Sequence, residues 1–144
     1  MSAYEPFEVE IKVRHYELDT LGHLNHAVYH QYAEIARLEL MEQAGGPGNA
    51  LRDERLAPVL LESQISFRRE LRSGDVVRVS CETKFSGGKT FRMDSAIRKL
   101  DGTVAAEITC TLGLMHLERR KLVDDPQGRL AAAGVDMARL TQSG

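Results

Sequence analysis

The chain has no tryptophan and no surplus of either charge. Its 144 residues include 19 lysines and arginines against 21 aspartates and glutamates, a formal net charge of −2. This balance gives no electrostatic reason to expect nucleic acid or a membrane surface as a partner. The apolar runs are far shorter than a bilayer requires, and acidic residues interrupt residues 1–12, where a signal peptide would be apolar. We therefore expect a soluble, cytoplasmic protein.

Cysteine is also scarce. Cys81 and Cys110 are the only two, and both fall within segments with the pattern of strands. In a cytoplasmic protein such residues usually stay reduced and act as small apolar side chains. We predict two buried thiols rather than a disulfide or a reactive pair, because neither has flanking residues that would lower its pKa. A serine-hydrolase site is not supported either, since no Gly-x-Ser-x-Gly motif occurs.

The chain does have enough apolar residues for one core. Hydrophobic residues make up 42% of the sequence, well outside the range of disordered proteins. A length of 144 residues suits a single domain, and no internal repeat or low-complexity segment divides it. We expect residues 1–144 to form one domain.

Periodicity predicts a strand, a long helix and then four more strands. Val9, Ile11 and Val13 alternate with charged residues, as in a half-buried strand. The helix should run from Asn25 or His26 to Ala44, with Asn25 as its N-cap and a Gly-Gly-Pro stop after it. Further strands are predicted at residues 58–68, 76–85, 90–99 and 103–117, with a helical turn near residues 49–54 and a terminal helix or frayed tail at residues 128–140.

The predicted helix has a broad apolar face and a polar face. His30, Glu34 and Arg37 fall on the polar side, where Glu34 and Arg37 are spaced for a surface ion pair. A role for Glu34 at an interface or pocket rim is the alternative. A wide apolar arc suits a helix around which a sheet wraps. The apolar side comprises Val28, Tyr29, Tyr32, Ala33, Ile35, Ala36 and Leu40.

This order of elements predicts an α+β architecture, in which one antiparallel sheet of five strands covers one helix. Such a sheet leaves at least one edge open. Pairing that edge with a second copy of the chain would cover it, so we expect a homodimer.

Chemistry-bearing residues gather between the first strand and the helix, from Arg14 to Arg37. Asp19 stands just before a glycine turn at Gly22, close to the start of the helix. Helix starts expose N–H groups without partners and are electropositive. A carboxylate beside them would suit attack on an ester-like carbonyl, while the N–H groups hold the oxygen that becomes negative. The alternative is that Asp19 only makes a turn hydrogen bond or caps the helix.

The same stretch has a metal-like spacing. Asp19, His23, His26 and His30 are four, three and four residues apart, and carboxylate and imidazole suit zinc. These side chains align only if the whole segment is helical, and residues 20–22 make a poor helix start. We therefore expect no metal, with His23 supporting the loop by hydrogen bonds and His30 on the solvated helix face.

Two basic motifs are weaker signals. Residues 86–90 read SGGKT, but the glycine that a phosphate loop requires five positions before Gly88 is replaced by Thr83. The segment also lies in a predicted hairpin, so nucleotide hydrolysis is rejected, although Lys84 and Lys89 remain placed for weak phosphate contacts. A second cluster, formed by Arg68, Arg69 and Arg72, reads as a solvated strand end.

The run DTLGHLNHAVY from Asp19 to Tyr29, followed by Glu34 and Arg37, resembles the opening motif of the 4-hydroxybenzoyl-CoA thioesterase-like family of hotdog-fold proteins. The resemblance covers about residues 7–118, which would form the core of the domain, with residues 119–144 as a C-terminal tail. It implies a hotdog fold, a long central helix wrapped by an antiparallel sheet, with two copies joined sheet edge to sheet edge.

The resemblance also implies hydrolysis of an acyl-CoA thioester at a dimer interface, without a cofactor. The catalytic aspartate of the family matches Asp19, and the backbone amide that polarises the carbonyl corresponds to about His26. His23 and Asn25 would shape the loop and Tyr29 would line the acyl pocket. The family grips CoA with backbone and basic groups, for which the candidates in this sequence are Arg68 and Lys89.

The chain departs from the family at one position and leaves some alternatives open. Many relatives carry a second asparagine where this chain has His26, whose side chain would alter acyl preference or assist proton transfer. Hydrolysis of acyl groups on acyl carrier protein is one rival activity, and non-catalytic binding of acyl-CoA is another. The sequence leaves open the acyl group, the role of Asp19 as base or nucleophile, and a homodimer against a homotetramer.

Overall fold

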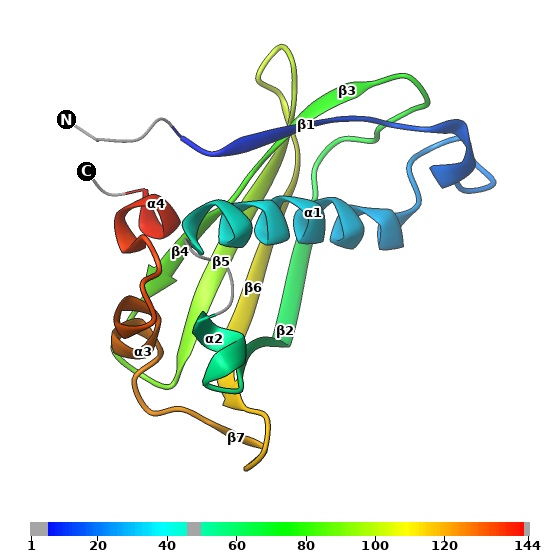
Figure 1. Ribbon diagram of the computed structural model, residues 1–144. Coiled ribbons are helices and arrows are strands. Elements are labelled where there is room, and N and C mark those ends of the chain that lie inside the picture. Colours follow the sequence, from blue (N-terminus) through cyan, green and yellow to red (C-terminus); the bar gives the residue numbers. More distant parts are fainter. Residues whose placement is uncertain (1–5, 46–49, 143–144) are drawn as a thin grey trace.

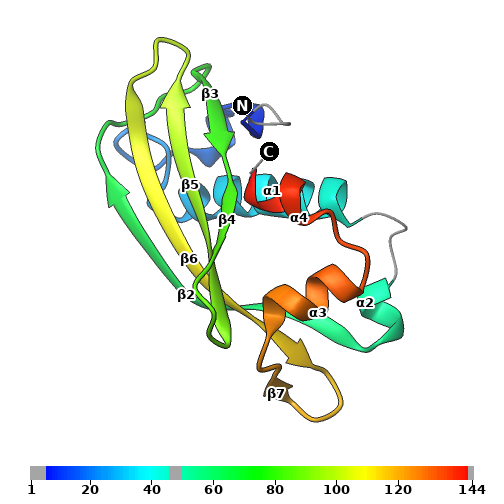
Figure 2. The same cartoon turned by 90° about the vertical axis from the view of Figure 1, so that its left-hand side faces the viewer.

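The computed structural model (Figure 1) describes residues 6–45 and 50–142 and has the architecture of a hotdog fold. A curved antiparallel sheet wraps around one long helix, which confirms the expected α+β class (Figure 2). The elements are β1 (Glu8–Lys12), η1 (His15–Glu17), α1 (His26–Ala44), α2 (Ala50–Asp53), β2 (Leu56–Phe67), β3 (Val76–Ser80), β4 (Glu82–Phe85), β5 (Thr90–Lys99), β6 (Val104–His116), β7 (Lys121–Leu122), α3 (Pro126–Ala132) and α4 (Met137–Thr141).

The main strands follow the order β1-β3-β5-β6-β2, while β4 pairs with β5 and β7 pairs with β6. The prediction of one strand over residues 76–85 is wrong, because it is split at Cys81. Here the Ser80 hydroxyl accepts a hydrogen bond from the Ala96 N–H at 3.0 Å and donates one to its carbonyl at 3.4 Å. The side chain therefore takes the place of the backbone ladder for one step, and pairing resumes in the same register at Glu82.

Helix α1 begins where the sequence predicted. Asn25 is the N-cap, and its side-chain oxygen accepts a hydrogen bond from the Ala27 N–H at 2.9 Å. Tyr32, Ala36 and Leu40 face the sheet and are fully buried, as expected. Their burial fixes the rotation of the helix, and with it the direction in which its first turn points.

The prediction that Arg37 lies on a solvated face is wrong. Only 8% of Arg37 is exposed, and its Nη1 donates to Cys110 Sγ over 3.4 Å across the interior. Its Nη2 is 3.8 Å from a Glu34 carboxylate oxygen, so the predicted pair exists with one partner buried. The long aliphatic stem lets the charge reach a polar gap between helix and sheet.

Both cysteines are buried and free, as predicted. Burial raises the pKa of Cys81 to about 12, which keeps the thiol protonated. Neither sulfur is exposed enough to act as a surface nucleophile.

The C-terminal segment packs on the body of the protein. The segment at residues 128–140, predicted as a terminal helix or a frayed tail, belongs to two short helices, α3 and α4, separated at Gly134, whose φ of +89° favours glycine. Leu130 and Leu140 are buried in the same core as α1, and α4 lies against α1 and β4. Strand β7 was not predicted, because two residues are too few for a periodic signal. Among the described helices none has the length and apolar character needed to span a membrane.

The core predicts a sharp contrast between two leucines of α1. Leu40 is 0% exposed and Leu38 is 57% exposed. We expect Leu40→Ala to lower the free energy of unfolding by about 2–5 kcal/mol, through lost burial and the cavity it leaves. The same change at Leu38 should cost about 0.5 kcal/mol or less. Urea unfolding of both variants checks this, and equal losses would contradict the packing of α1.

Candidate active site

The loop that carries Asp19 closes on itself before α1 begins. The Asp19 N–H donates to the His23 carbonyl at 2.8 Å, and the Gly22 N–H donates to the Asp19 carbonyl at 3.1 Å. Gly22 has a φ of +80°, a conformation that other residues rarely adopt. Leu18 and Leu24 form a bridge across the base of the loop. The glycine turn therefore presents Asp19 at a defined position beside the helix.

Asp19 makes the turn hydrogen bonds that were one of the two alternatives from the sequence, and this leaves one carboxylate oxygen for the other. Its Oδ1 accepts hydrogen bonds from the N–H groups of Leu21 at 2.9 Å and His23 at 3.2 Å, so the residue does stabilise the turn. Its Oδ2 has no hydrogen-bond partner within residues 6–45 and 50–142. One oxygen thus holds the loop and the other remains available to a ligand.

A short hydrogen bond ties this loop to α1. The Tyr32 hydroxyl donates to Glu17 Oε1 at 2.6 Å, and the Glu17 carbonyl accepts from the Asn25 N–H at 2.9 Å. Burial and the Glu17 carboxylate both raise the pKa of Tyr32. Burial alone would raise the pKa of Glu17, but the hydrogen bonds from Tyr32 and the Arg14 backbone outweigh it and lower that pKa. The loop is therefore fixed relative to the first turn of the helix.

The first turn of α1 has one free donor. The Ala27 N–H is taken by the Asn25 side chain, and the Val28 N–H donates to the Asn25 carbonyl at 2.9 Å. The N–H of His26 has no acceptor in the described part of the chain. Of the first three N–H groups of the helix, only that of His26 therefore remains available to a ligand. It lies at the electropositive end of a 19-residue helix.

Asp19 and His26 line the same open cavity, of about 310 Å³. The structure brings into it five of the seven residues singled out from the sequence, which are Asp19, His23, His26, Tyr29 and Arg68. Sequence reasoning did not identify Phe67 and Glu70 as site residues, and it read Arg69 as part of a strand end. The complete lining is Asp19, His23, Leu24, His26, Tyr29, Phe67, Arg68, Arg69 and Glu70.

The far side of the cavity comes from the end of β2. Phe67 meets the ring of Tyr29 edge to face, with centroids 5.1 Å apart, and forms an apolar wall. Burial raises the pKa of Tyr29, so its hydroxyl stays neutral. Glu70 Oε2 lies 3.2 Å from His23 Nε2. Hydrogen bonding from Arg72, with a smaller contribution from His23, lowers the pKa of Glu70.

Two of the expected site residues do not line this cavity. Asn25 caps the helix and so positions His26 without facing the cavity. Lys89 lies in the turn before β5 and lines a different cavity of about 810 Å³, where its Nζ is 3.5 Å from an Asp124 carboxylate oxygen. The metal-like spacing is not realised on one helix face, since Asp19 and His23 lie in the loop. No group of three or more histidine, cysteine, aspartate or glutamate side chains in the described residues is placed to hold a metal ion.

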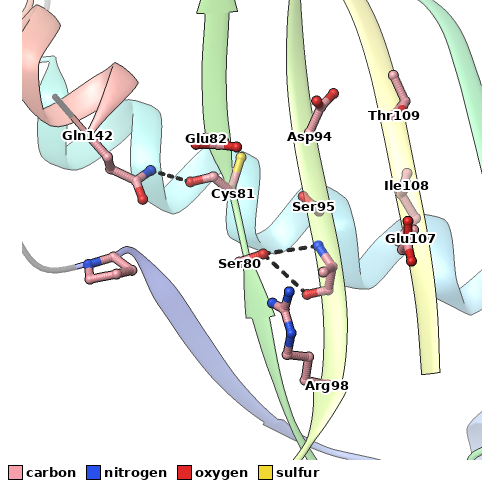
Figure 3. A pocket seen from close by; sticks show the side chains of 12 residues that line it. Ser80, Cys81, Glu82, Asp94, Ser95, Arg98, Glu107, Ile108, Thr109 and Gln142 are labelled. Atoms are coloured by element: carbon pink, nitrogen blue, oxygen red, sulfur yellow. Dashed lines mark hydrogen bonds between the residues drawn. The ribbon is translucent and has the colours of Figure 1, made fainter. Parts of the chain in front are cut away.

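A further cavity of about 460 Å³ lies over the break between β3 and β4 (Figure 3). Ser80 and Asp94 line it, together with Gln142 from the C-terminal end. Within the described residues, Asp94 Oδ1 is buried without a hydrogen-bond partner, while Oδ2 is held by Lys84 and Arg92. None of the residues expected in the site lines this cavity.

Comparison with known proteins identifies the family of the chain. A family model described as the thioesterase-like superfamily matches residues 13–133. The acyl-acyl carrier protein thioesterase ATL2 of Arabidopsis thaliana is 40% identical over 80 residues, which cover 56% of this chain and 42% of the relative. The chain spans less than half the length of the plant relatives that it matches.

One sequence match and one structure match, both from Escherichia coli, extend over most of the matched chain. The long-chain acyl-CoA thioesterase FadM is 26% identical over 115 residues, which cover 79% of this chain and 86% of FadM. The crystal structure of YbaW, a probable thioesterase, has a TM-score of 0.82 at 24% identity and shares the fold over 94% of this chain and 98% of its own. Because the family model covers most of its residues, the chain belongs to the thioesterase-like superfamily.

Proposed function

We propose that the protein hydrolyses an acyl-CoA thioester to a free carboxylic acid and CoA. The observation that carries the proposal is the pairing, in one cavity, of a carboxylate oxygen and a helix N–H that both lack partners in the described chain. Hydrolysis needs a group that attacks or activates water and a donor for the oxyanion, and Asp19 and His26 supply this pair. The names of the Escherichia coli and plant relatives support the same reaction class.

Two routes fit the free oxygen of Asp19. As a general base, Oδ2 takes a proton from water, whose oxygen attacks the carbonyl carbon, and the proton reaches the leaving sulfur as the C–S bond breaks. As a nucleophile, Oδ2 attacks the carbonyl carbon and expels the thiolate of CoA, which leaves a mixed anhydride that water hydrolyses. Both routes return Asp19 to its ionised form.

The His26 N–H serves both routes in the same way. The negative charge that develops on the thioester oxygen is stabilised by a donor that is already oriented, so no reorganisation is needed during reaction. Asn25 and the Tyr32–Glu17 hydrogen bond hold this donor relative to Asp19. His23, through its contact with Glu70, shapes the opposite side of the loop.

The substrate is bound around this centre. In this proposal Tyr29 and Phe67 form an apolar wall for the acyl group, and Arg68, which also lines the cavity, binds the phosphates of CoA. Lys89 lines a different cavity of its own chain, so it could bind CoA at this site only from the partner subunit.

A homodimer is part of this proposal. Strand β2 forms one edge of the sheet, and Leu60, Leu61 and Phe67 along it are about half exposed. An exposed edge with apolar side chains is normally covered in a stable protein. Pairing of two β2 edges covers it and gives a C2 dimer, which a homotetramer of two such dimers would retain.

Acyl carrier protein is the second candidate carrier. The plant relatives bear the name of acyl-acyl carrier protein thioesterases, and the same Asp19 chemistry serves either carrier. Comparing matched acyl-CoA and acyl-carrier-protein substrates separates the two activities. Binding of acyl-CoA without hydrolysis is the third reading, which measurable turnover would exclude.

The Asp19→Asn variant tests the proposed base or nucleophile. The side-chain amide oxygen of the new asparagine keeps the two turn hydrogen bonds, so we expect an intact fold with turnover lowered several hundredfold or more, on the scale of about 10²–10⁴ for such groups. The readout is a hydrolysis screen over short, long, branched and aryl acyl-CoA compounds. Near-wild-type rates with the best substrate would defeat the assignment.

Asp101→Asn is the matched control for that variant. Asp101 Oδ1 accepts from the Thr103 N–H at 2.9 Å, the same local turn that Asp19 makes, but Asp101 lines none of the described cavities. We expect its turnover to remain at the wild-type level. A similar loss in both variants would indicate a general effect of changing a turn aspartate.

Replacing His26 by proline tests the oxyanion donor alone. Position 26 is the first residue of α1, where proline is well tolerated, and Asn25 at ψ 133° suits a residue before proline. We expect a folded helix and a fall in kcat of about 10²–10³, the usual cost of one oxyanion donor. His26→Ala keeps the N–H and should retain most activity. An equal loss in the alanine variant would assign the role to the imidazole instead.

A further inference from the structure

The turn between β6 and β7 is a basic projection without a role in the site described so far. We call its three cations, Arg119, Arg120 and Lys121, the basic hairpin. Figure 2 shows this loop extending away from the body at the end of the sheet. All three residues are exposed, and none of them forms an ion pair with the described residues. The surrounding cations are neutralised, since Lys89 pairs with Asp124 and Arg129 with Glu54.

The basic hairpin is held in place by the start of β2. The Leu117 N–H donates to the Arg55 carbonyl at 2.9 Å, and Arg55 Nη1 lies 2.9 Å from Glu118 Oε1. A second hydrogen bond, from the Arg120 N–H to the His116 carbonyl at 2.7 Å, closes the turn. The one acidic residue of the turn is thus used internally, which leaves three ordered positive charges facing solvent.

In its own chain the basic hairpin lies at the wrong end of the sheet to help Asp19. Leu56 pairs with His116, next to the hairpin, whereas Phe67 lines the Asp19 cavity at the other end of β2. β2 has 12 residues, so these ends are about 40 Å apart at roughly 3.4 Å per residue. That distance exceeds the pantetheine arm that joins an acyl sulfur to its carrier.

Pairing β2 with the β2 of a second copy brings the basic hairpin of one subunit close to the Asp19 cavity of the other. A twofold axis through the edge makes the two strands antiparallel, so the Leu56 end of one lies beside the Phe67 end of the other. Strands in a sheet are about 4.8 Å apart, and the partner's β6 is one strand further. The partner subunit's basic hairpin then stands beside the Asp19 cavity, at the same level along the strands.

We propose that the basic hairpin of one subunit docks an acidic acyl carrier protein whose thioester is hydrolysed at Asp19 of the other. The inference rests on the proposed thioesterase function and assigns to this surface the second candidate carrier, acyl carrier protein. Three exposed cations on a projecting turn suit the carboxylates of a protein surface, where complementary charge guides association. Arg119 and Lys121 also line the cavity of about 810 Å³ that contains Lys89, but Asp124 and Asp125 line it too, and their carboxylates would repel the phosphates of a nucleotide.

Charge reversal tests the docking surface. The variant is Arg119→Glu with Lys121→Glu, and the substrates carry the acyl group that the wild type hydrolyses best, on acyl carrier protein, CoA or N-acetylcysteamine. We expect kcat/KM to fall at least about tenfold with acyl carrier protein, mainly through KM, and to stay unchanged with N-acetylcysteamine, which has no carrier. An equal fall with CoA, or no fall with acyl carrier protein, would overturn the proposal.

The control is Lys12→Glu with Arg98→Glu. It makes the same change of net charge at two cations that form no ion pair in the described chain, on β1 and β5. We expect the kcat/KM of this control to equal the wild-type value with all three substrates. A tenfold loss with acyl carrier protein in the control would show that net charge, and not the basic hairpin, causes the effect. If the wild-type protein hydrolyses none of the thioesters, the proposed function is wrong. That result is distinguishable from a failure of the docking proposal, in which the wild type is active and the charge reversal has no effect.

Mixed dimers test whether the hairpin acts across the interface. One subunit carries Asp19→Asn and the other carries the reversed hairpin. If the site combines two subunits, one fully wild-type site forms per dimer, with half the wild-type kcat and the wild-type KM for acyl carrier protein. If both elements act within one chain, the only active site has the reversed hairpin, and the raised KM of that variant would refute the arrangement.

Discussion

The start of helix α1 is the constraint on which the site depends. Hydrogen bonding within a helix leaves its first N–H groups unpaired, and each needs a partner or access to a polar ligand. Here Asn25 satisfies the second and third, which leaves the N–H of His26, a residue that lines the cavity, without an acceptor in the described chain. The burial of Tyr32 and Leu40 against the sheet fixes where that N–H points. Core packing and site geometry are therefore determined by the same helix.

In the proposed mechanism, Asp19 serves structure and chemistry at once. Its two oxygens are inequivalent, because the backbone of the turn occupies one and leaves the other free. A turn aspartate and a reactive aspartate are thus compatible here, although the sequence presented them as alternatives. The arrangement also orients the free oxygen, since the turn hydrogen bonds restrict rotation of the carboxylate. A side chain without that restraint would lose entropy on reaching the reactive geometry.

The parts that the sequence predicted well are those encoded locally. The start and end of α1 follow from a capping residue and a glycine stop, and Asp19, His23 and His26 are close in the chain, so their meeting needed no knowledge of the fold. Phe67 and Glu70 join them only because β2 returns to the start of α1, which no local pattern reveals. The burial of Arg37 and the break at Cys81 depend on tertiary hydrogen bonds, from Arg37 to Cys110 and between Ser80 and Ala96.

Edge pairing of β2 connects stability with function in the proposed dimer. A sheet that ends in an unpaired apolar strand needs a cover, and a second copy provides one with every hydrogen bond matched by symmetry. The same symmetry places the first residues of one β2 beside the last residues of the other. Residues at opposite ends of the strand therefore become neighbours across the interface. A feature anchored at the start of β2, such as the turn held by Arg55, is thereby delivered to the site at its end. Selection for a covered edge would then retain the geometry that a two-subunit site requires.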